Sequence, residues 1–486
     1  MHKSNRLLAT GTPLLLALAL AGCMTVGPDY QRPALDVPDG TVQAQGGSTG
    51  RNVSSAELLA WWKSFQDPVL DSLLAEAAAN SQDLVLAAGR IEEARAGVAV
   101  ANANRYPAVD ATASAARSRT SENSGRLAPG AGTGSKDFQL GLTASYEIDF
   151  WGKFRRADEA ARARLLAQED YRGVVLTSLY STLAQSYFAL RSYDAQLALA
   201  ESALKTRQEN LRLQQRRFSA GTVGELDLHQ AEGELAATEV TRAQAIQLIA
   251  TTEAAIALLA GRSPRDVASP QIQRGANIAD LYAHMVVPAD LPADLLNQRP
   301  DILAAEQALR AANADIGQAR SQYFPSVRLT SGAGYESNAL RDLINPASLL
   351  WNIGAGLVQP VFRAGAIGAL VSGAEARKTQ AQAQYVQSVQ GAFRDVHDAL
   401  VAQSANDVIF AASTRRAKAL QDTLRLATLR YDNGYSSYLE VLTAQRDLLQ
   451  TQSTVIDVQR AHLSATVGLY RAVGGGWTAQ ETLVSN

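Results

Sequence analysis

Residues 138–150 read FQLGLTASYEIDF, and this stretch decides the fold. Apolar side chains at every even position alternate with polar residues or glycine at the odd positions. A period of two is typical of a β-strand with one apolar and one polar face. The alternation predicts four strands in all, at about residues 107–119, 137–150, 325–336 and 350–361. Each is roughly ten residues long, which is enough to cross a bilayer when a strand is tilted.

Four strands of this kind cannot close a barrel by themselves. Strands that are apolar on one face and polar on the other suit a water-filled barrel in a membrane. Lipid does not tolerate open sheet edges, and small barrels need about eight strands or more. The sequence therefore predicts a barrel that is shared between chains, and it leaves open a soluble β-layer beside helices.

Two long stretches predict helices of unusual length. In the first, an apolar residue recurs every seventh position, at Leu176, Leu183, Leu190, Leu197, Leu204, Leu211 and Phe218. A sustained heptad indicates a supercoiled seam against another helix. A helix over 153–220 would be on the order of 100 Å long, which suits a tube wall or a stalk. The core of a helical bundle would explain the periodicity but not this length.

The two halves of the chain repeat one pattern, offset by roughly 215 residues. The segment Arg217-Phe218-Ser219-Ala220-Gly221 matches Arg430-Tyr431-Asp432-Asn433-Gly434. Gly221 and Gly434 each interrupt a helical pattern, and glycine suits a turn because it accepts positive φ. The pattern predicts helix pairs over 153–260 and 366–473. We expect a first repeat over 54–270, a second over 271–473, and a tail over 474–486.

The N-terminus resembles a bacterial lipoprotein signal. A basic start and a short Leu/Ala stretch precede Leu20-Ala21-Gly22-Cys23, which is similar to a lipobox. We expect a signal peptide over 1–22, a covalent lipid on Cys23 and an extended arm over 23–53. Met24 after the cysteine favours delivery to the outer membrane. A plain signal peptide with a chance cysteine is the alternative.

Composition argues against several other functions. The formal net charge is −2, so no basic field suggests nucleic acid. The five histidines have no metal-ligand spacing, and no phosphate-binding glycine loop is evident. His397 and His462, inside helical stretches, are expected to be hydrogen-bonded or to face solvent. We expect no enzyme activity and no cofactor apart from the lipid.

Several segments together resemble the outer-membrane factors of tripartite efflux systems, the TolC/OprM-like family, and within it the NodT-like lipoprotein branch. They include Gly27-Pro28-Asp29-Tyr30-Gln31-Arg32-Pro33, Trp61-Trp62, Asp67-Pro68, Tyr146-Glu147-Ile148-Asp149-Phe150-Trp151-Gly152-Lys153, Asn297-Gln298-Arg299-Pro300-Asp301, Phe324-Pro325 and Gly474-Gly475-Gly476-Trp477. The resemblance implies an α+β membrane protein that forms a homotrimer. A 12-stranded transmembrane β-barrel, with four strands per chain, would continue into a long periplasmic α-helical barrel.

The resemblance also implies a function. The chain would be a passive exit duct that expels drugs or other small molecules across the outer membrane. Its partners would be a periplasmic adaptor protein, an inner-membrane RND-type pump and outer-membrane lipid. A duct for type I protein secretion is the alternative, and a structural lipoprotein with a coiled-coil stalk is a third possibility.

The same resemblance places a gate at the periplasmic tip, around the two glycine turns. The candidate residues are Arg217, Gly221, Glu225, Asp227, Thr428, Arg430, Asp432, Gly434 and Glu440. Relatives carry an acid where this chain has Thr428, so the neighbouring acids are alternatives for an acidic ring. Asp227 and Glu440 could instead cap helices or be ordinary surface charges. The two arginines could bond turn carbonyls or nearby acids.

Overall fold

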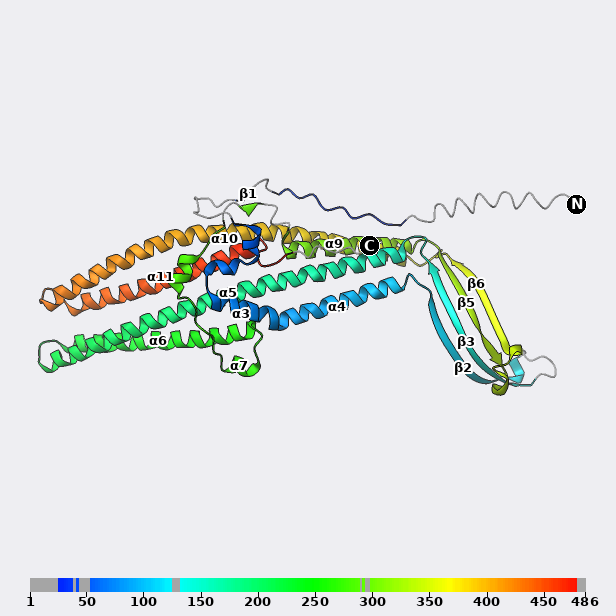
Figure 1. Cartoon of the computed structure of the whole chain (residues 1–486), viewed down its shortest axis with the longest axis horizontal. Helices are drawn as coiled ribbons and strands as arrows, with labels where there is room; N and C mark the ends of the chain where they lie inside the picture. The colour runs from blue at the N-terminus through cyan, green and yellow to red at the C-terminus, as the bar shows by residue number, and fades with distance from the viewer. Residues whose placement is uncertain are drawn as a thin grey trace. The chain divides into compact units, whose positions relative to one another are not determined.

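The computed structural model describes residues 25–37, 41–42, 53–124, 132–288, 291–292 and 298–478 (Figure 1). The expected signal peptide and Cys23 lie outside the described residues, as do most of the arm beyond Val37 and the end of the tail. The chain divides into two compact units. The first comprises Met1–Pro33, Ile91–Ala167 and Ala305–Tyr385, and the second comprises the remaining residues.

The first unit contains a four-stranded antiparallel sheet with the order β2-β3-β5-β6. Its strands are β2 (Ala108–Arg119), β3 (Gly134–Ile148), β5 (Ser326–Ser337) and β6 (Leu349–Val358). They lie in the four stretches that alternate in sequence. β6 stops at Val358, earlier than expected, and Pro360 beyond it has no N–H to donate to a ladder.

Strand register brings like faces together. Tyr146 lies opposite Leu329, and Ala333 lies opposite Trp351, so apolar side chains share one face. This face is uncovered, because Trp351 is 70% exposed. A sheet packed beside helices would bury such a residue, so the alternative of a soluble β-layer is not supported.

The opposite face of the sheet is polar and built from small residues. Gly141 lies opposite Gly334, and Thr330 lies opposite Gly354. Thr330 and Gly354 are exposed, and a polar face of this kind suits the lining of an aqueous passage.

Three pairs of helices repeat in length between the two halves. The first half has α4 (Gln82–Ala103), α5 (Lys153–Ser219) and α6 (Glu225–Leu259), and the second has α9 (Pro300–Ser321), α10 (Ala366–Asp432) and α11 (Tyr438–Ala472). Both α4 and α9 have 22 residues, both α5 and α10 have 67, and both α6 and α11 have 35. The matching lengths agree with the expected internal duplication.

Short elements complete the two units. They are α2 (Ser55–Leu59), η1 (Trp61–Phe65), α3 (Pro68–Asn80), η2 (Glu122–Ser124), α7 (Pro264–Ala268), α8 (Ile278–His284), η4 (Leu340–Asp342), η5 (Pro346–Ser348) and the two-residue pair β1 (Thr41–Val42) with β4 (Leu291–Pro292). In the described residues, no helix is both long enough and apolar enough to cross a membrane.

The core of the second unit is aromatic. The Trp61 ring stacks on Tyr470 with centroids 5.6 Å apart, and the Phe65 ring lies 4.9 Å from Phe188. All four side chains are buried. Aromatic contacts of this kind add to the free energy of area burial. They fix the short helix η1, on which the sequence pattern gave no periodicity.

The described part of the N-terminal arm packs on the first unit. The Val26 N–H donates to the Trp151 carbonyl at 3.0 Å, and the Asn313 amide donates to the Pro28 carbonyl at 2.8 Å. Tyr30 donates to Glu306 at 3.3 Å, and burial and this carboxylate raise the pKa of its phenol to about 12. The arm is therefore held residue by residue, which its Pro/Gly-rich sequence did not indicate.

His462 corrects one expectation. Its side chain is buried, and neither ring nitrogen has a hydrogen-bond partner among the described residues. The ring lies 5.3 Å from that of Tyr282 on α8, a helix that we did not anticipate there, and Nε2 lies 3.5 Å from Asp407 Oδ1. Burial lowers the pKa of His462 below its ordinary value, while Asp407 opposes the shift.

Candidate functional site: the helix hairpin turns

The first helix hairpin of the second unit, α5 with α6, ends in a tight turn. The Gly221 N–H donates to the Phe218 carbonyl at 2.9 Å, and the Thr222 N–H donates to the Arg217 carbonyl at 2.9 Å. Gly221 has a φ of +72°, a conformation that side chains with a Cβ rarely adopt. This geometry ends α5 and reverses the chain.

The second hairpin, α10 with α11, ends in the same way. The Gly434 N–H donates to the Tyr431 carbonyl at 2.9 Å, and the Tyr435 N–H donates to the Arg430 carbonyl at 2.8 Å. Gly434 has a φ of +75°. The two turns are thus equivalent in hydrogen bonding as well as in sequence.

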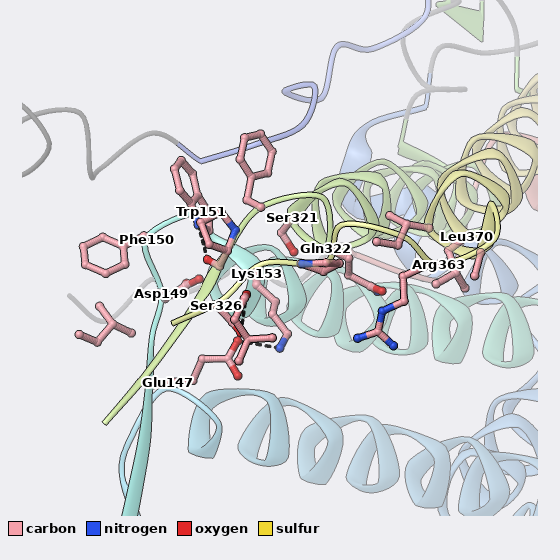
Figure 2. A pocket seen from close by; sticks show the side chains of 17 residues that line it. Glu147, Asp149, Phe150, Trp151, Lys153, Ser321, Gln322, Ser326, Arg363 and Leu370 are labelled. Carbon is pink, nitrogen blue, oxygen red and sulfur yellow. Dashed lines mark hydrogen bonds and ion pairs between the residues drawn. The ribbon is translucent and has the colours of Figure 1, made fainter. Parts of the chain in front are cut away.

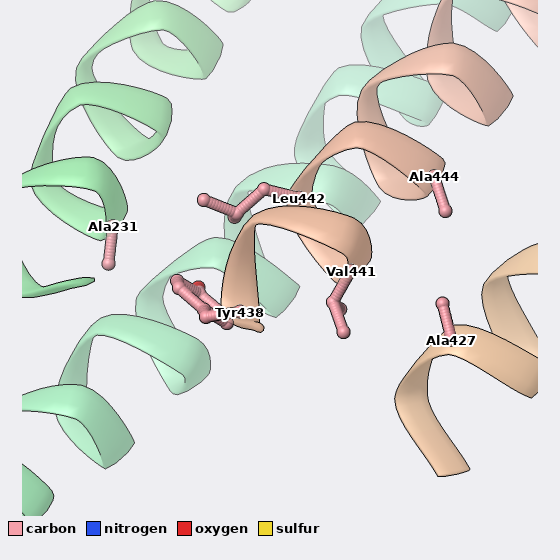
Figure 3. Packing of buried hydrophobic residues seen from close by; sticks show 6 residues of the cluster. All are labelled: Ala231, Ala427, Tyr438, Val441, Leu442 and Ala444. Carbon is pink, nitrogen blue, oxygen red and sulfur yellow. The ribbon is translucent and has the colours of Figure 1, made fainter. Parts of the chain in front are cut away.

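Below the turns, an apolar cluster joins the hairpins (Figure 3). Its buried members are Ala231, Ala427, Tyr438, Val441, Leu442 and Ala444, and Leu211, Leu424 and Tyr431 pack against it. These residues come from α5, α6, α10 and α11 together. The two hairpins therefore share one core next to their ends.

A polar network connects α5 to the end of α10. The Arg217 guanidinium lies over the Tyr431 ring, 5.2 Å from its centroid, and 3.9 Å from Asp432 Oδ1. The Gln214 amide donates to the Tyr431 hydroxyl at 3.2 Å. The two contacts of Arg217 contribute roughly 0.5–1 kcal/mol each, as is usual at exposed sites. They restrain one hairpin against the other.

A second, more buried contact lies deeper along α5. Arg207 is 5% exposed and pairs with Glu234 of α6 at 3.3 Å. It also donates to Gln445 of α11. Burial lowers the pKa of Arg207, and Glu234 opposes this shift. One guanidinium thus joins three helices.

Among the described residues, two of the expected site residues make only local contacts. The Arg430 guanidinium donates to the Tyr435 carbonyl in its own turn at 3.4 Å. The Thr428 hydroxyl donates to the Leu424 carbonyl one helical turn earlier, at 2.9 Å. Arg217 reaches an acid and Arg430 reaches a turn carbonyl, so the two arginines differ in role.

The expected acids of the helix starts are not caps. The capping positions are Gly224 and Ser437, and neither shows a side-chain cap hydrogen bond. Glu225, Asp227 and Glu440 lie within the first turns, where the helix dipole favours negative charge. A capping role for Asp227 and Glu440 is therefore wrong, whereas the alternative of a surface charge stays open.

Two residues that join the hairpins were not predicted from the sequence. Gln214 and Arg207 lie seven residues apart on α5. Each lies three residues after an apolar residue of the heptad, so both fall on the side of the helix that carries the apolar seam. A polar residue at a core position of a coiled coil fixes the register of its partners. Reading the polar residues of the heptad, and not only the leucines, would have found both.

The remaining chemical expectations concern the lipid and metals. Cys23 lies outside the described residues, so its lipidation stays a prediction. Across the described ranges, no group of three or more His, Cys, Asp or Glu side chains is placed to hold a metal ion.

The family profile described as "Outer membrane efflux protein" matches residues 73–262 and 291–475. The chain belongs to this family. The two matched stretches follow the two halves of the chain, each with its long helix, glycine turn and second helix. The resemblance to outer-membrane factors is confirmed.

Relatives match over nearly the whole chain. The cation efflux system protein CusC of Escherichia coli K12 is 38% identical, covering 96% of this chain and 98% of its own. The solvent efflux pump outer membrane protein SrpC of Pseudomonas putida is 36% identical over 96% and 98% of the two chains. The crystal structure of the CmeC outer membrane channel of Campylobacter jejuni superposes with a TM-score of 0.86 at 26% identity, covering 94% and 96%.

These findings define the class of protein. The family and its members are efflux channels of the outer membrane, so this chain is an outer-membrane efflux duct and not an enzyme.

Proposed function

We propose that three copies of the chain form one duct, which serves as the outer-membrane exit of a tripartite efflux pump of the RND type. The strands of three copies form a 12-stranded barrel in the membrane. The long helices form a tube in the periplasm, and a lipid on Cys23 adds an anchor. The number three comes from the resemblance to outer-membrane factors.

The observation that carries this proposal is the sheet with two open edges. In the described residues, β2 pairs only with β3, and β6 pairs only with β5. The sheet also has an uncovered apolar face, with Ile353 79% exposed and Leu142 57% exposed. Lipid covers an apolar face but leaves an open edge unsatisfied. Strands of further copies satisfy both edges.

The hairpin turns form the gate of this duct. Arg217 holds the α5 hairpin against the α10 hairpin through partly exposed contacts, and the buried Gln214 adds a hydrogen bond to Tyr431. Contacts of this strength are stable enough to favour one arrangement and weak enough for a partner to reverse it. Binding of a pump and adaptor opens the tip by displacing these contacts.

Apolar side chains at the turns support a partner there. Leu226 is 70% exposed, Leu439 is 54% exposed and Tyr435 is 78% exposed. Leu226 and Leu439 occupy equivalent positions in the two halves. A tube of three copies would present six such turns, and an adaptor protein is the partner that we propose for them.

The cargo follows the pump and not the duct. CusC is named for cations and SrpC for solvents, yet this chain is nearly equally identical to both. We propose drugs or other small molecules as cargo, with the inner-membrane pump selecting among them.

Dye accumulation in a host that lacks its own outer-membrane ducts tests this function. The chain is expressed with a pump and adaptor, and retained fluorescent drug is compared with an empty vector. We expect accumulation to fall only when pump and adaptor are both present.

A Cys23→Ala chain serves as the comparison for anchoring. It should reduce efflux in proportion to the amount lost from the outer membrane. Unchanged accumulation with every pump and adaptor pair, despite wild-type protein in the outer membrane, would reject small-molecule efflux and favour protein secretion.

A further inference from the structure

The first unit contains a cavity of about 330 Å³ where the sheet ends and the helices begin (Figure 2). Glu147 and Ser326 line it, and both belong to the polar face of the sheet. Glu147 lies opposite Arg328 in the strand register, and Ser326 lies opposite Val358. The cavity therefore opens beside the polar face, which the proposed function places along the lumen.

One wall of the cavity is apolar and rigid. The Trp151 and Phe324 rings stack with centroids 4.6 Å apart and an angle of 25° between their planes. The Trp151 indole N–H donates to the Pro325 carbonyl at 2.8 Å, which fixes the ring. Ile367 and Leu370 of α10 also line the cavity. A hydrocarbon or aromatic group would find a preformed surface here.

The carboxylates of the cavity are already neutralised. Glu147 lies between Lys153 Nζ at 2.9 Å and the Arg328 guanidinium at 3.6 Å. Asp149 accepts the backbone N–H of Arg155 at 2.9 Å and lies 3.5 Å from its guanidinium. Neither acid is left to balance a further cation.

Arg363 is that further cation. It lines the cavity, and its guanidinium has no hydrogen bond or ion pair to any residue that the structure describes. The first residues of α10, Ala366 and Ile367, also line the cavity, so the positive end of a helix dipole faces it. Two cations and two carboxylates line the cavity, and the carboxylates also pair with Arg155 and Arg328 from outside the lining, so the Arg363 guanidinium is left without a counter-charge among the described residues.

We propose that this cavity binds amphipathic organic anions, with Arg363 holding the acidic group and the Trp151–Phe324 wall holding the apolar part. The inference rests on the proposed function only for its position beside the lumen. A volume of about 330 Å³ lies at the small end of ligand pockets, which suits a two-ring aromatic acid. A cation of the same shape meets the unpaired Arg363 guanidinium and binds more weakly.

Calorimetric titration of the purified full chain in lipid nanodiscs tests this site. The probe is naphthalene-2-sulfonate, and its charge-inverted counterpart is 2-naphthyl-trimethylammonium. Empty nanodiscs correct for partition into lipid. We expect saturable binding of the sulfonate at one site per chain and roughly tenfold weaker binding of the cation.

Two substitutions at Arg363 identify the charge. Arg363→Gln should weaken sulfonate binding roughly tenfold or more, because a charge-assisted hydrogen bond is lost. Arg363→Lys should restore most of it. The control is Arg416→Gln, which removes an exposed arginine elsewhere on α10 and should leave binding unchanged.

The outcomes separate this inference from the duct itself. Equal binding of both probes, or sulfonate binding that is unchanged in Arg363→Gln, overturns the site. So does a wild-type protein that conducts ions in planar bilayers yet binds no sulfonate. Arg363-dependent binding by a protein that never conducts keeps the site and removes the duct.

Discussion

A single buried carboxylate organises the second unit. Asp67 is fully buried, and its oxygens accept the Val69 N–H at 2.8 Å and the Tyr187 hydroxyl at 2.7 Å. It also accepts the Ala276 N–H at 3.0 Å, from a segment that follows α7. The side chain therefore caps α3 and ties two distant segments to it. No alanine fits at Gly275, where an added Cβ would lie 2.1 Å from Asp67 Oδ1.

Tyr187→Phe should lower stability by about 1–3 kcal/mol, because Asp67 loses a donor and the Gly275 N–H loses its acceptor. The measurement is the thermal midpoint of the helical circular dichroism signal in detergent. The control is Tyr193→Phe on the same helix. A midpoint for Tyr187→Phe equal to that of the control contradicts the role of Asp67.

His462 predicts a pH dependence of stability. Its pKa in the folded chain is lowered from the ordinary value of 6.5 by burial. Below the ordinary value of 6.5, this histidine binds a proton in the unfolded chain but not in the folded chain, so the free energy of unfolding falls as the pH falls. The contribution of the neutral His462 ring to stability is fully present above about pH 6.5 and is lost as the pH falls toward its lower pKa in the folded chain.

His462→Gln should therefore lose less stability than wild type between about pH 7.5 and about pH 5.5. His397→Gln, which changes an exposed histidine, should follow wild type. Identical losses in His462→Gln and wild type would show that the buried ring does not titrate in this range.

At the residue scale, the sequence predicted backbone conformation at the turns better than it predicted contacts between side chains. Gly221 and Gly434 were expected to accept positive φ, and both do. The burial of His462 was missed because it depends on α8, which is far away in the chain. Contacts between distant segments leave no local pattern to read.

At the scale of elements, the question is how the two hairpins restrain each other. Arg217 contributes a cation–π contact and an ion pair, whereas Tyr431 contributes a ring and a hydroxyl. Tyr431→Phe keeps the ring and loses the Gln214 hydrogen bond. Arg217→Gln loses both charged contacts.

We therefore expect the resting single-channel conductance in planar bilayers to rise in both variants, and more in Arg217→Gln. Each contact is worth about 0.5–1 kcal/mol, which shifts a two-state gate a few-fold. The double variant should rise by less than the product of the single effects, because the contacts share Tyr431. Arg212→Gln, an exposed arginine of α5, is the control, and equal conductance in all variants contradicts the gate.

Elements were the best predicted level of this structure. Periods of seven and of two indicated long helices and strands, and α10 ends at Asp432, just before the Gly434 that was expected to interrupt it. Periodicity did not predict the segments that are ordered by contacts with distant residues. The arm around Tyr30 and the short helix η1 have no repeat, and they are ordered by Glu306 and Tyr470 respectively.

At the scale of the whole molecule, the central claim is that no single chain closes the sheet. The alternating strands predicted this from number alone, since four strands are too few for a barrel. The number of copies could not be predicted from the sequence. An unpaired sheet edge requires a strand from another chain, but it does not determine how many chains close the barrel.

Cysteine cross-linking between the two sheet edges tests this claim most directly. Thr112→Cys on the polar face of β2 is combined with a scan of cysteines at positions 350, 352, 354, 356 and 358, which share that face on β6. A disulfide forms only where two Cα atoms come within about 7 Å. After oxidation in the outer membrane, the account predicts covalent dimers and trimers at one or two adjacent scan positions, and none from chains with a single new cysteine. Cross-links confined to one chain, or none across the scan in membrane-inserted protein, would contradict it.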